Sequence, residues 1–299
     1  MADFALSRRV ILCFQLCGLH SINLSHMKDS KEVDGAMIKY RLYQLLHIIV
    51  VGANCIVVIF CPNSIMFAND PLGRFNDWIK YYAALFTSCL ILTESYFRVR
   101  QLIEIFRLSG RLDGIFGSIR VDLSQESVTS YRVYIRKFLP FAAMLLLLEI
   151  WALPFFLTNT PMFNYWILTF PMLLQSRFRQ LQHILYIDLC HHYARVLASN
   201  VKELAVFLNA LEGTSGDSSA EYRRKFVNYR FRVLQRAHHV VWEISNCINT
   251  YFGWSQVANY AFHFLQLLAD SYWLYYRFYN QSYGVGMCNS EHLNLVASH

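Results

Sequence analysis

The chain has 299 residues, of which 55% are hydrophobic and 16% are charged, and its formal net charge is +7. Soluble domains contain about 25% charged residues, so this composition argues against a water-soluble globular protein. A basic protein can bind nucleic acid, but here Lys and Arg occur in three separate segments between apolar stretches. This pattern indicates membrane topology, and we expect no nucleic-acid partner.

The first predicted segment, residues 1–41, holds six Lys and Arg. Arg8 and Arg9 precede the apolar run Val10–Leu24, as in a secretory signal, but the run contains polar residues and no clear small-residue cleavage site follows it. We therefore interpret residues 1–41 as a cytoplasmic amino-terminal segment that leads to the first span.

Five stretches are apolar enough to be predicted as membrane spans, since a crossing helix needs about 20 mostly apolar residues. They are Leu42–Cys61, Trp78–Phe97, Phe138–Thr160, Pro161–Ser176 with the apolar continuation Phe178–Leu189, and Ile244–Ala269. The second span carries Lys80 and Glu94 near its two ends, where we expect both side chains to reach the membrane interface.

Charge counting predicts the orientation. Residues 1–41, 98–137 and 177–243 hold six, eight and ten of the 27 Lys and Arg, and the alternate connections hold almost none. Because positive charge is retained on the cytoplasmic side during insertion, we expect a multi-pass protein of the cell membrane with a cytoplasmic amino terminus. The cytoplasmic loop is then 98–137, and residues 270–299 form an extracellular tail.

The cytoplasmic region 177–243 is predicted to be a helical anchor. Arg177–Leu211 contains neither Pro nor Gly, Gly213–Ser219 is typical of a flexible linker, and helical character resumes at Ala220–Glu243. The predicted fold class is therefore all-α, a polytopic membrane helix bundle. Its transmembrane helices 1–4 lie within 42–176, the fifth is 244–269, and helices 4 and 5 have long inward extensions.

A polar stripe marks the fifth span. Its members, spaced three or four residues apart on one helix face, are Gln256, Asn259, His263, Gln266 and Asp270. Because polar groups in hydrocarbon are costly unless they are paired or hydrated, we expect the stripe to face the protein interior. Two interpretations stay open: it lines a ligand cavity or conduction path, or it forms hydrogen bonds between helices.

Aromatic and polar residues of the outer half of the bundle are candidates for a pocket that binds small organic ligands, including cationic ones. The candidate residues are Tyr82, Glu149, Trp151, Phe155, Tyr165, Trp166, Asn259, Tyr260, His263 and Gln266. The alternative for each aromatic residue is a place in the interfacial belt of a membrane protein.

Catalysis is not predicted. A membrane enzyme needs His, Cys or carboxylate side chains clustered at one depth, and Glu149 with His263 alone does not supply such a cluster. The eight Cys residues lack metal-ligand spacing, so we expect no metal and no cofactor. A transporter would show two related halves with Gly- or Pro-interrupted helices, and none is evident.

Three groups of residues resemble the insect gustatory receptor family. Phe14–Leu19 is similar to the aromatic-rich Leu-Gly-Leu run before the first helix of that family. Asn249–Trp254 resembles the Phe-Gly opening of its fifth span, and Asp270–Tyr276 resembles the Tyr-rich outer end. The resemblance covers essentially the whole chain and agrees with the inside amino terminus.

The resemblance implies a gustatory receptor subunit that detects small organic tastants. It also implies a tastant-gated, nonselective cation channel of four identical or related subunits, with the ligand pocket in the outer half of each bundle and the cytoplasmic helices as the anchor between subunits. The family has seven spans, and its pore-lining seventh helix carries a signature that Thr250, Tyr251 and Gln256 only approximate. We therefore expect a chain truncated after the fifth span that cannot conduct by itself. The alternatives are an odorant receptor subunit and a non-conducting partner that modulates full-length receptors.

Overall fold

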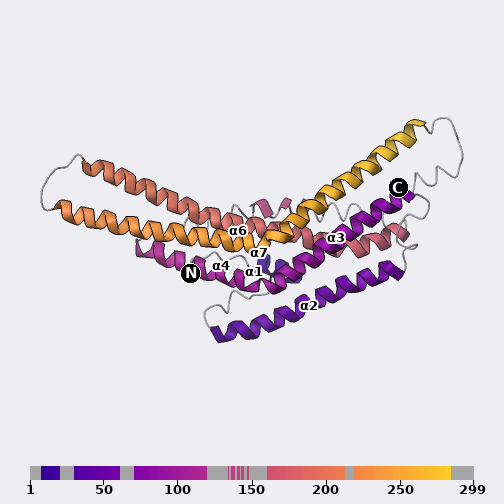
Figure 1. The fold of residues 1–299 in the computed structure, drawn as a ribbon, viewed down its shortest axis with the longest axis horizontal. Coiled ribbons are helices and arrows are strands. Elements are labelled where there is room, and N and C mark those ends of the chain that lie inside the picture. The colour runs from indigo at the N-terminus through magenta and orange to yellow at the C-terminus, as the bar shows by residue number, and fades with distance from the viewer. Residues whose placement is uncertain are drawn as a thin grey trace. The chain divides into compact units, whose positions relative to one another are not determined.

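The structure, a computed structural model, describes residues 8–20, 30–60, 71–119, 160–212 and 219–283, together with individual positions between 134 and 147. The described parts are helical and contain no strand. The helices are α1 (Arg8–Leu16), α2 (Ser30–Phe60), α3 (Pro71–Phe97), α4 (Val99–Ser118), α6 (Thr160–Glu212) and α7 (Ser219–Tyr283) (Figure 1). The predicted all-α fold class is confirmed at this level.

The two longest helices follow from a scarcity of breaking residues. Within the 53 residues of α6 there is no Gly, and Pro171 lies inside the helix. The 65 residues of α7 contain no Pro and a single Gly, Gly253. Each helix therefore joins a predicted span to its predicted inward extension without a break, as the sequence pattern indicates. The predicted linker Gly213–Ser219 lies outside the described residues apart from Ser219, where α7 begins.

Four of the predicted spans fall within described helices: α2 contains most of the first, α3 the second, α6 the fourth and α7 the fifth. Most of the third, Phe138–Thr160, lies outside the described residues. Across the described ranges, no helix combines the length and the apolar character that a membrane crossing requires. The helices are thus confirmed as helices, and the crossings themselves stay predictions.

Contacts between residues divide the chain into two compact units. Unit 1 comprises residues 1–14, 97–140 and 180–253, and unit 2 comprises residues 15–96, 141–179 and 254–299. In unit 1 the second half of α6 and the first half of α7 lie side by side (Figure 1). The ring centroids of Phe207 and Phe226 are 5.9 Å apart, and Arg230 pairs with Glu203 at 3.4 Å. These contacts join the two predicted anchor helices to each other.

Unit 1 also joins α4 to α6 and α7. The Tyr193 hydroxyl donates to Asp113 Oδ1 at 3.0 Å, and the Arg98 guanidinium donates to the Thr250 carbonyl. Phe252 lies within 5.6 Å of Tyr186 between ring centroids, and both side chains are buried. The Phe252 of the predicted Phe-Gly opening is therefore a core residue of this unit.

Unit 2 holds the turn that follows α1. Gly18 has a φ of 71°, a left-handed conformation that favours glycine, and its carbonyl accepts a hydrogen bond from Gln44 Nε2 at 3.0 Å. Leu19, directly after it, has no exposed surface. The stretch Leu16–Leu19 thus forms a tight turn that packs against α2, which gives its resemblance to the Leu-Gly-Leu pattern a structural reason.

Candidate functional site

Buried polar side chains gather on three helices of unit 2. On α6 the spacing of 175, 176 and 179 places them on one face, as does the spacing of 255, 256 and 259 on α7. The buried polar and charged residues at this place are Thr87, Ser88, Glu94 and Ser95 on α3, Gln175, Ser176 and Arg179 on α6, and Ser255, Gln256 and Asn259 on α7. Polar groups removed from solvent require partners. The contacts of these side chains therefore indicate the role of the site.

The centre of the set is an ion pair. Arg179 Nη2 lies 3.4 Å from Glu94 Oε2, and the exposed fractions of the two side chains are 0% and 6%. The guanidinium also donates from Nε to Ser255 Oγ at 3.1 Å and from Nη1 to Ser95 Oγ at 3.4 Å. A buried charge is tolerated when it is paired and hydrogen-bonded, and Arg179 has both kinds of partner from two other helices.

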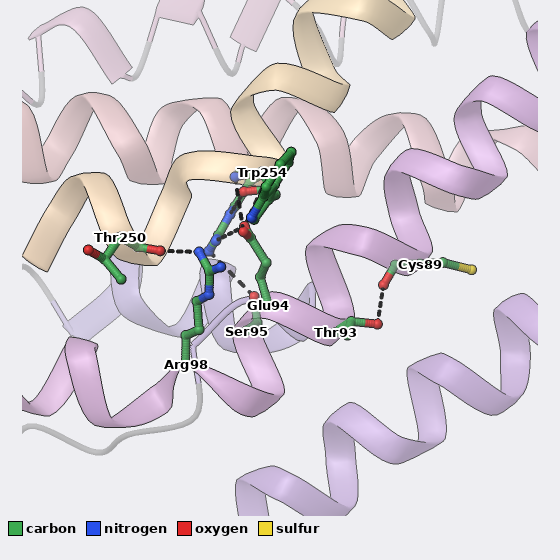
Figure 2. A network of polar contacts seen from close by, with 9 residues as sticks. Cys89, Thr93, Glu94, Ser95, Arg98, Thr250 and Trp254 are labelled. Carbon is green, nitrogen blue, oxygen red and sulfur yellow. Dashed lines mark hydrogen bonds and ion pairs between the residues drawn. The ribbon is translucent and has the colours of Figure 1, made fainter.

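Glu94 has a second set of partners in the backbone of α7. Its Oε1 accepts from the N–H of Trp254 at 3.0 Å (Figure 2). Its Oε2 accepts from the N–H of Ser255, also at 3.0 Å. The carboxylate therefore binds two consecutive amides inside a long helix as well as the Arg179 guanidinium. This differs from the expectation that Glu94 reaches the membrane interface. The charged partner on α6 and the two amides on α7 keep it inside.

A row of neutral contacts continues along the same helices. The Ser88 hydroxyl donates to Gln175 Oε1, and Gln175 Nε2 donates to the Cys17 carbonyl at 3.1 Å. Ser176 Oγ donates to Asn259 Oδ1 at 2.7 Å. These bonds tie α3, α6, α7 and the turn after α1 together, which is the interhelical bonding that the sequence left as one of its two interpretations.

Near this row, three buried polar atoms form no hydrogen bond with any described residue. Asn259 Nδ2, Gln256 Nε2 and Tyr81 Oη are buried, and none of them has a hydrogen-bond partner among the residues that the structure describes. If the amide oxygen and nitrogen of Asn259 are interchanged, the nitrogen bonds to Ser176 and the oxygen becomes the atom without a partner, at the same position. Buried polar atoms without a partner are uncommon, so these atoms of α3 and α7 are candidate contact points.

Aromatic candidates occupy two different environments. Tyr165 is partly buried and packs against the core cluster of Tyr81, Met172 and Phe262, and the half-buried Trp166 stacks on Phe170 with centroids 4.9 Å apart. Tyr82 is 40% exposed, with its ring 5.0 Å from that of Trp78, and Tyr260 is 67% exposed. The structure thus brings Tyr165 to the core of unit 2 and leaves Tyr82 and Tyr260 on its surface.

The polar stripe of α7 changes character along its length. Gln256 and Asn259 are buried, His263 and Gln266 are half-buried, and Asp270 is exposed and pairs with Lys80 at 2.5 Å. The inner members therefore face the protein and the last member does not. Lys80 is held by this pair at the other end of α3 from Glu94.

Three of the candidate residues, Glu149, Trp151 and Phe155, lie outside the described residues. Sequence reasoning missed Arg179 as a site residue, since it was counted among the cations of a cytoplasmic region. The signal that could have found it is a cation between the apolar stretch Pro161–Ser176 and the apolar continuation up to Leu189, matched by Glu94, the single acid in the second span's inner half. In the described ranges, no group of His, Cys, Asp and Glu is arranged to hold a metal ion.

The fold and this site define an all-helical protein whose helices are joined through buried polar groups. A sequence model described as "7tm Chemosensory receptor" matches residues 8–296. The match covers almost the whole chain, so the protein belongs to the 7tm chemosensory receptor family. No curated protein and no solved structure matched the chain.

Proposed function

We propose that the chain is a gustatory-type receptor subunit of a tastant-gated, nonselective cation channel, and that it binds a small organic tastant in unit 2. Membership of the chemosensory receptor family supports binding of a small molecule. The gustatory type is supported by the Phe252 and Gly253 opening and by the Tyr-rich stretch that follows Asp270. Assembly with three further subunits, identical or related, is part of the same proposal.

The observation that carries the ligand proposal is the amide of Asn259. Its side chain has no exposed surface, one half of the amide bonds to Ser176, and the other half has no partner in the described part of the chain. Gln256 offers a second donor one turn away on the same face. Both amides lie on α7 with Phe262, which belongs to the aromatic core of Tyr81 and Tyr165, and amide groups of this kind suit an organic ligand that can form hydrogen bonds.

The membrane is the third part of the proposal. We place the protein in the cell membrane with a cytoplasmic amino terminus, supported by the family and by the 24 Lys and Arg in residues 1–41, 98–137 and 177–243. An epitope fused before Met1 should then react with antibody only after cells are permeabilised. Labelling of intact cells would reject this orientation. An epitope fused after His299 should, in contrast, react with antibody on intact cells.

Ligand binding is tested on the purified full chain in detergent, with sucrose, caffeine and quinine as probes. We expect one of these probe classes to raise the melting temperature in a concentration-dependent manner, because a ligand that binds only the folded state stabilises it. The variant Asn259→Leu should lose that shift, whereas Tyr260→Phe, a change on the exposed surface, should keep it. An unchanged shift in Asn259→Leu would exclude this site as the binding site.

Channel function requires a separate measurement. The chain is expressed alone and together with another gustatory receptor subunit, and tastant-evoked currents are recorded under voltage clamp. The proposal expects the chain to alter the ligand dependence of the current in the co-expressed cells, and expects Asn259→Leu to abolish that alteration. Responses to volatile odorants in place of tastants would favour an odorant receptor subunit instead.

A further inference from the structure

Glu94 makes a contact that a helix interior rarely offers. In a regular α-helix each N–H donates to the carbonyl four residues earlier, and free N–H groups are found in the first turn. Trp254 and Ser255 lie far inside α7, which begins at Ser219, yet both amides donate to the Glu94 carboxylate at 3.0 Å. A side chain that inserts into the backbone ladder in this manner is a physical cause of local helix distortion.

Arg179 orients the carboxylate for this contact. Its guanidinium binds Glu94 Oε2, and it is itself fixed by the hydroxyls of Ser95 on α3 and Ser255 on α7. The three helices thus meet through one closed set of charge-assisted bonds, all inside unit 2. Charge-assisted bonds are roughly twice as strong as neutral ones, so the set is a strong local constraint on the backbone of α7.

We infer that Glu94 and Arg179 form a latch that fixes the backbone of α7 at Trp254 and Ser255, with Glu94 as the positioning residue. Asn259 lies one turn beyond Ser255 on the same helix and bonds to Ser176, which is three residues before Arg179 on α6. The latch therefore sets where α7 presents Asn259 to α6. It requires no ligand, so its test is independent of tastant binding.

A latch and an ordinary buried ion pair differ in one chemical requirement. The ion pair needs opposite charges at the two positions, whereas the latch needs an acceptor on the α3 side for two backbone N–H groups. A double variant with Glu94→Arg and Arg179→Glu restores the opposite charges but places a donor-only side chain opposite the amides. The swap should rescue an ion pair and should not rescue a latch.

The test is hydrogen–deuterium exchange of the purified full chain in detergent, read by mass spectrometry. In Glu94→Gln, which keeps one acceptor oxygen and loses the charge, we expect exchange in peptides covering residues 250–258 to rise about tenfold, while peptides covering 195–204 stay unchanged. The swapped double variant should show the same or a larger local rise. Glu104→Gln, the same chemical change in the exposed pair with Arg107, is the matched control.

Three results would overturn the latch. They are unchanged exchange at residues 250–258 in Glu94→Gln, an equal rise in every peptide, and recovery of parental exchange in the swapped double variant. Should Glu94→Gln fail to fold, Ser95→Ala and Ser255→Ala provide milder changes, because they remove hydroxyl contacts of Arg179 and leave both charges. Each should give a smaller rise at the same peptides, and no rise in either variant would also reject the latch.

Discussion

Ser176 donates a hydrogen bond of 2.7 Å to Asn259, and both side chains are buried between α6 and α7. The bond joins the two longest helices at a point where neither side chain meets solvent. It also uses one half of the Asn259 amide and leaves the other half without a partner among the described residues. The same residue is thus a structural link and a candidate ligand contact, and the two roles can be separated experimentally.

The first prediction concerns this bond. Ser176→Ala should lower the free energy of unfolding by about 1–3 kcal/mol, because it leaves the Asn259 oxygen buried without its donor. Asn259→Ala should cost a similar amount, and the double variant should cost less than the sum of the two, by a coupling of about 0.5–3 kcal/mol. Denaturant titration of the parental protein, the two single variants and the double variant measures these free energies. Strict additivity would show that the two residues do not interact.

The second prediction compares two glycines. Gly18 has a φ of 71°, and a Cβ there would lie 3.3 Å from the His47 and Leu92 side chains, whereas a Cβ at Gly253 would meet no atom within 4 Å. Gly18→Ala should therefore destabilise the protein by about 1 kcal/mol or more. Gly253→Ala should stabilise it by about 0.5–1 kcal/mol, since alanine is the better helix former. Opposite shifts in melting temperature are expected, and a loss of stability in Gly253→Ala would contradict the helical geometry at that position.

Helical structure could be predicted from the sequence to a large extent. The patterns of residues 177–211 and 220–243 predict long helices without Pro or Gly, and α6 and α7 contain them. The end of the last helix could not be placed, because hydropathy marks where an apolar span ends and not where a helix ends. Residues 270–283 are polar and aromatic but contain no Gly or Pro, and α7 continues through them to Tyr283.

The site was predictable only in part. Helical spacing correctly placed Gln256 and Asn259 on one buried face, since periodicity determines which residues share a face. It could not determine which partner Glu94 meets, because Arg179 is 85 residues away in the chain and only packing brings them together. Tyr260 follows Asn259 directly and so points away from the buried face, where its side chain is 67% exposed.

The third prediction contrasts an exposed and a buried ion pair of unit 2. Lys80 and Asp270 are 2.5 Å apart, but the Asp270 side chain is 57% exposed. Asp270→Asn should change the free energy of unfolding by less than about 1 kcal/mol, and added salt should reduce the effect further. Arg179→Gln should cost about 3–5 kcal/mol with little dependence on salt, because it leaves a buried carboxylate without its cation. Denaturation at low and high ionic strength checks both, and similar costs for the two variants would contradict the difference in burial.

The fourth prediction is a pH dependence of unit 1 that arises at His192. The side chain is 6% exposed, and burial lowers its pKa below the usual value of 6.5, with the nearby Arg195 lowering it further and Asp113 opposing the change. Because the pKa is lower in the folded state, the unfolded chain binds more protons below pH 6.5, and folding stability falls as the pH decreases. The contribution of His192 is complete above its unfolded pKa and is lost as pH falls through the folded value.

The melting temperature of the full chain, measured from pH 8 to pH 5, should therefore decrease on the acidic side. His192→Phe replaces the imidazole by a ring that cannot be protonated, so the acidic decrease should become shallower in this variant. His191→Phe changes the exposed neighbour on the same helix and should keep the parental pH profile. If the two variants respond to pH alike, the titration arises elsewhere and the buried imidazole is not its source.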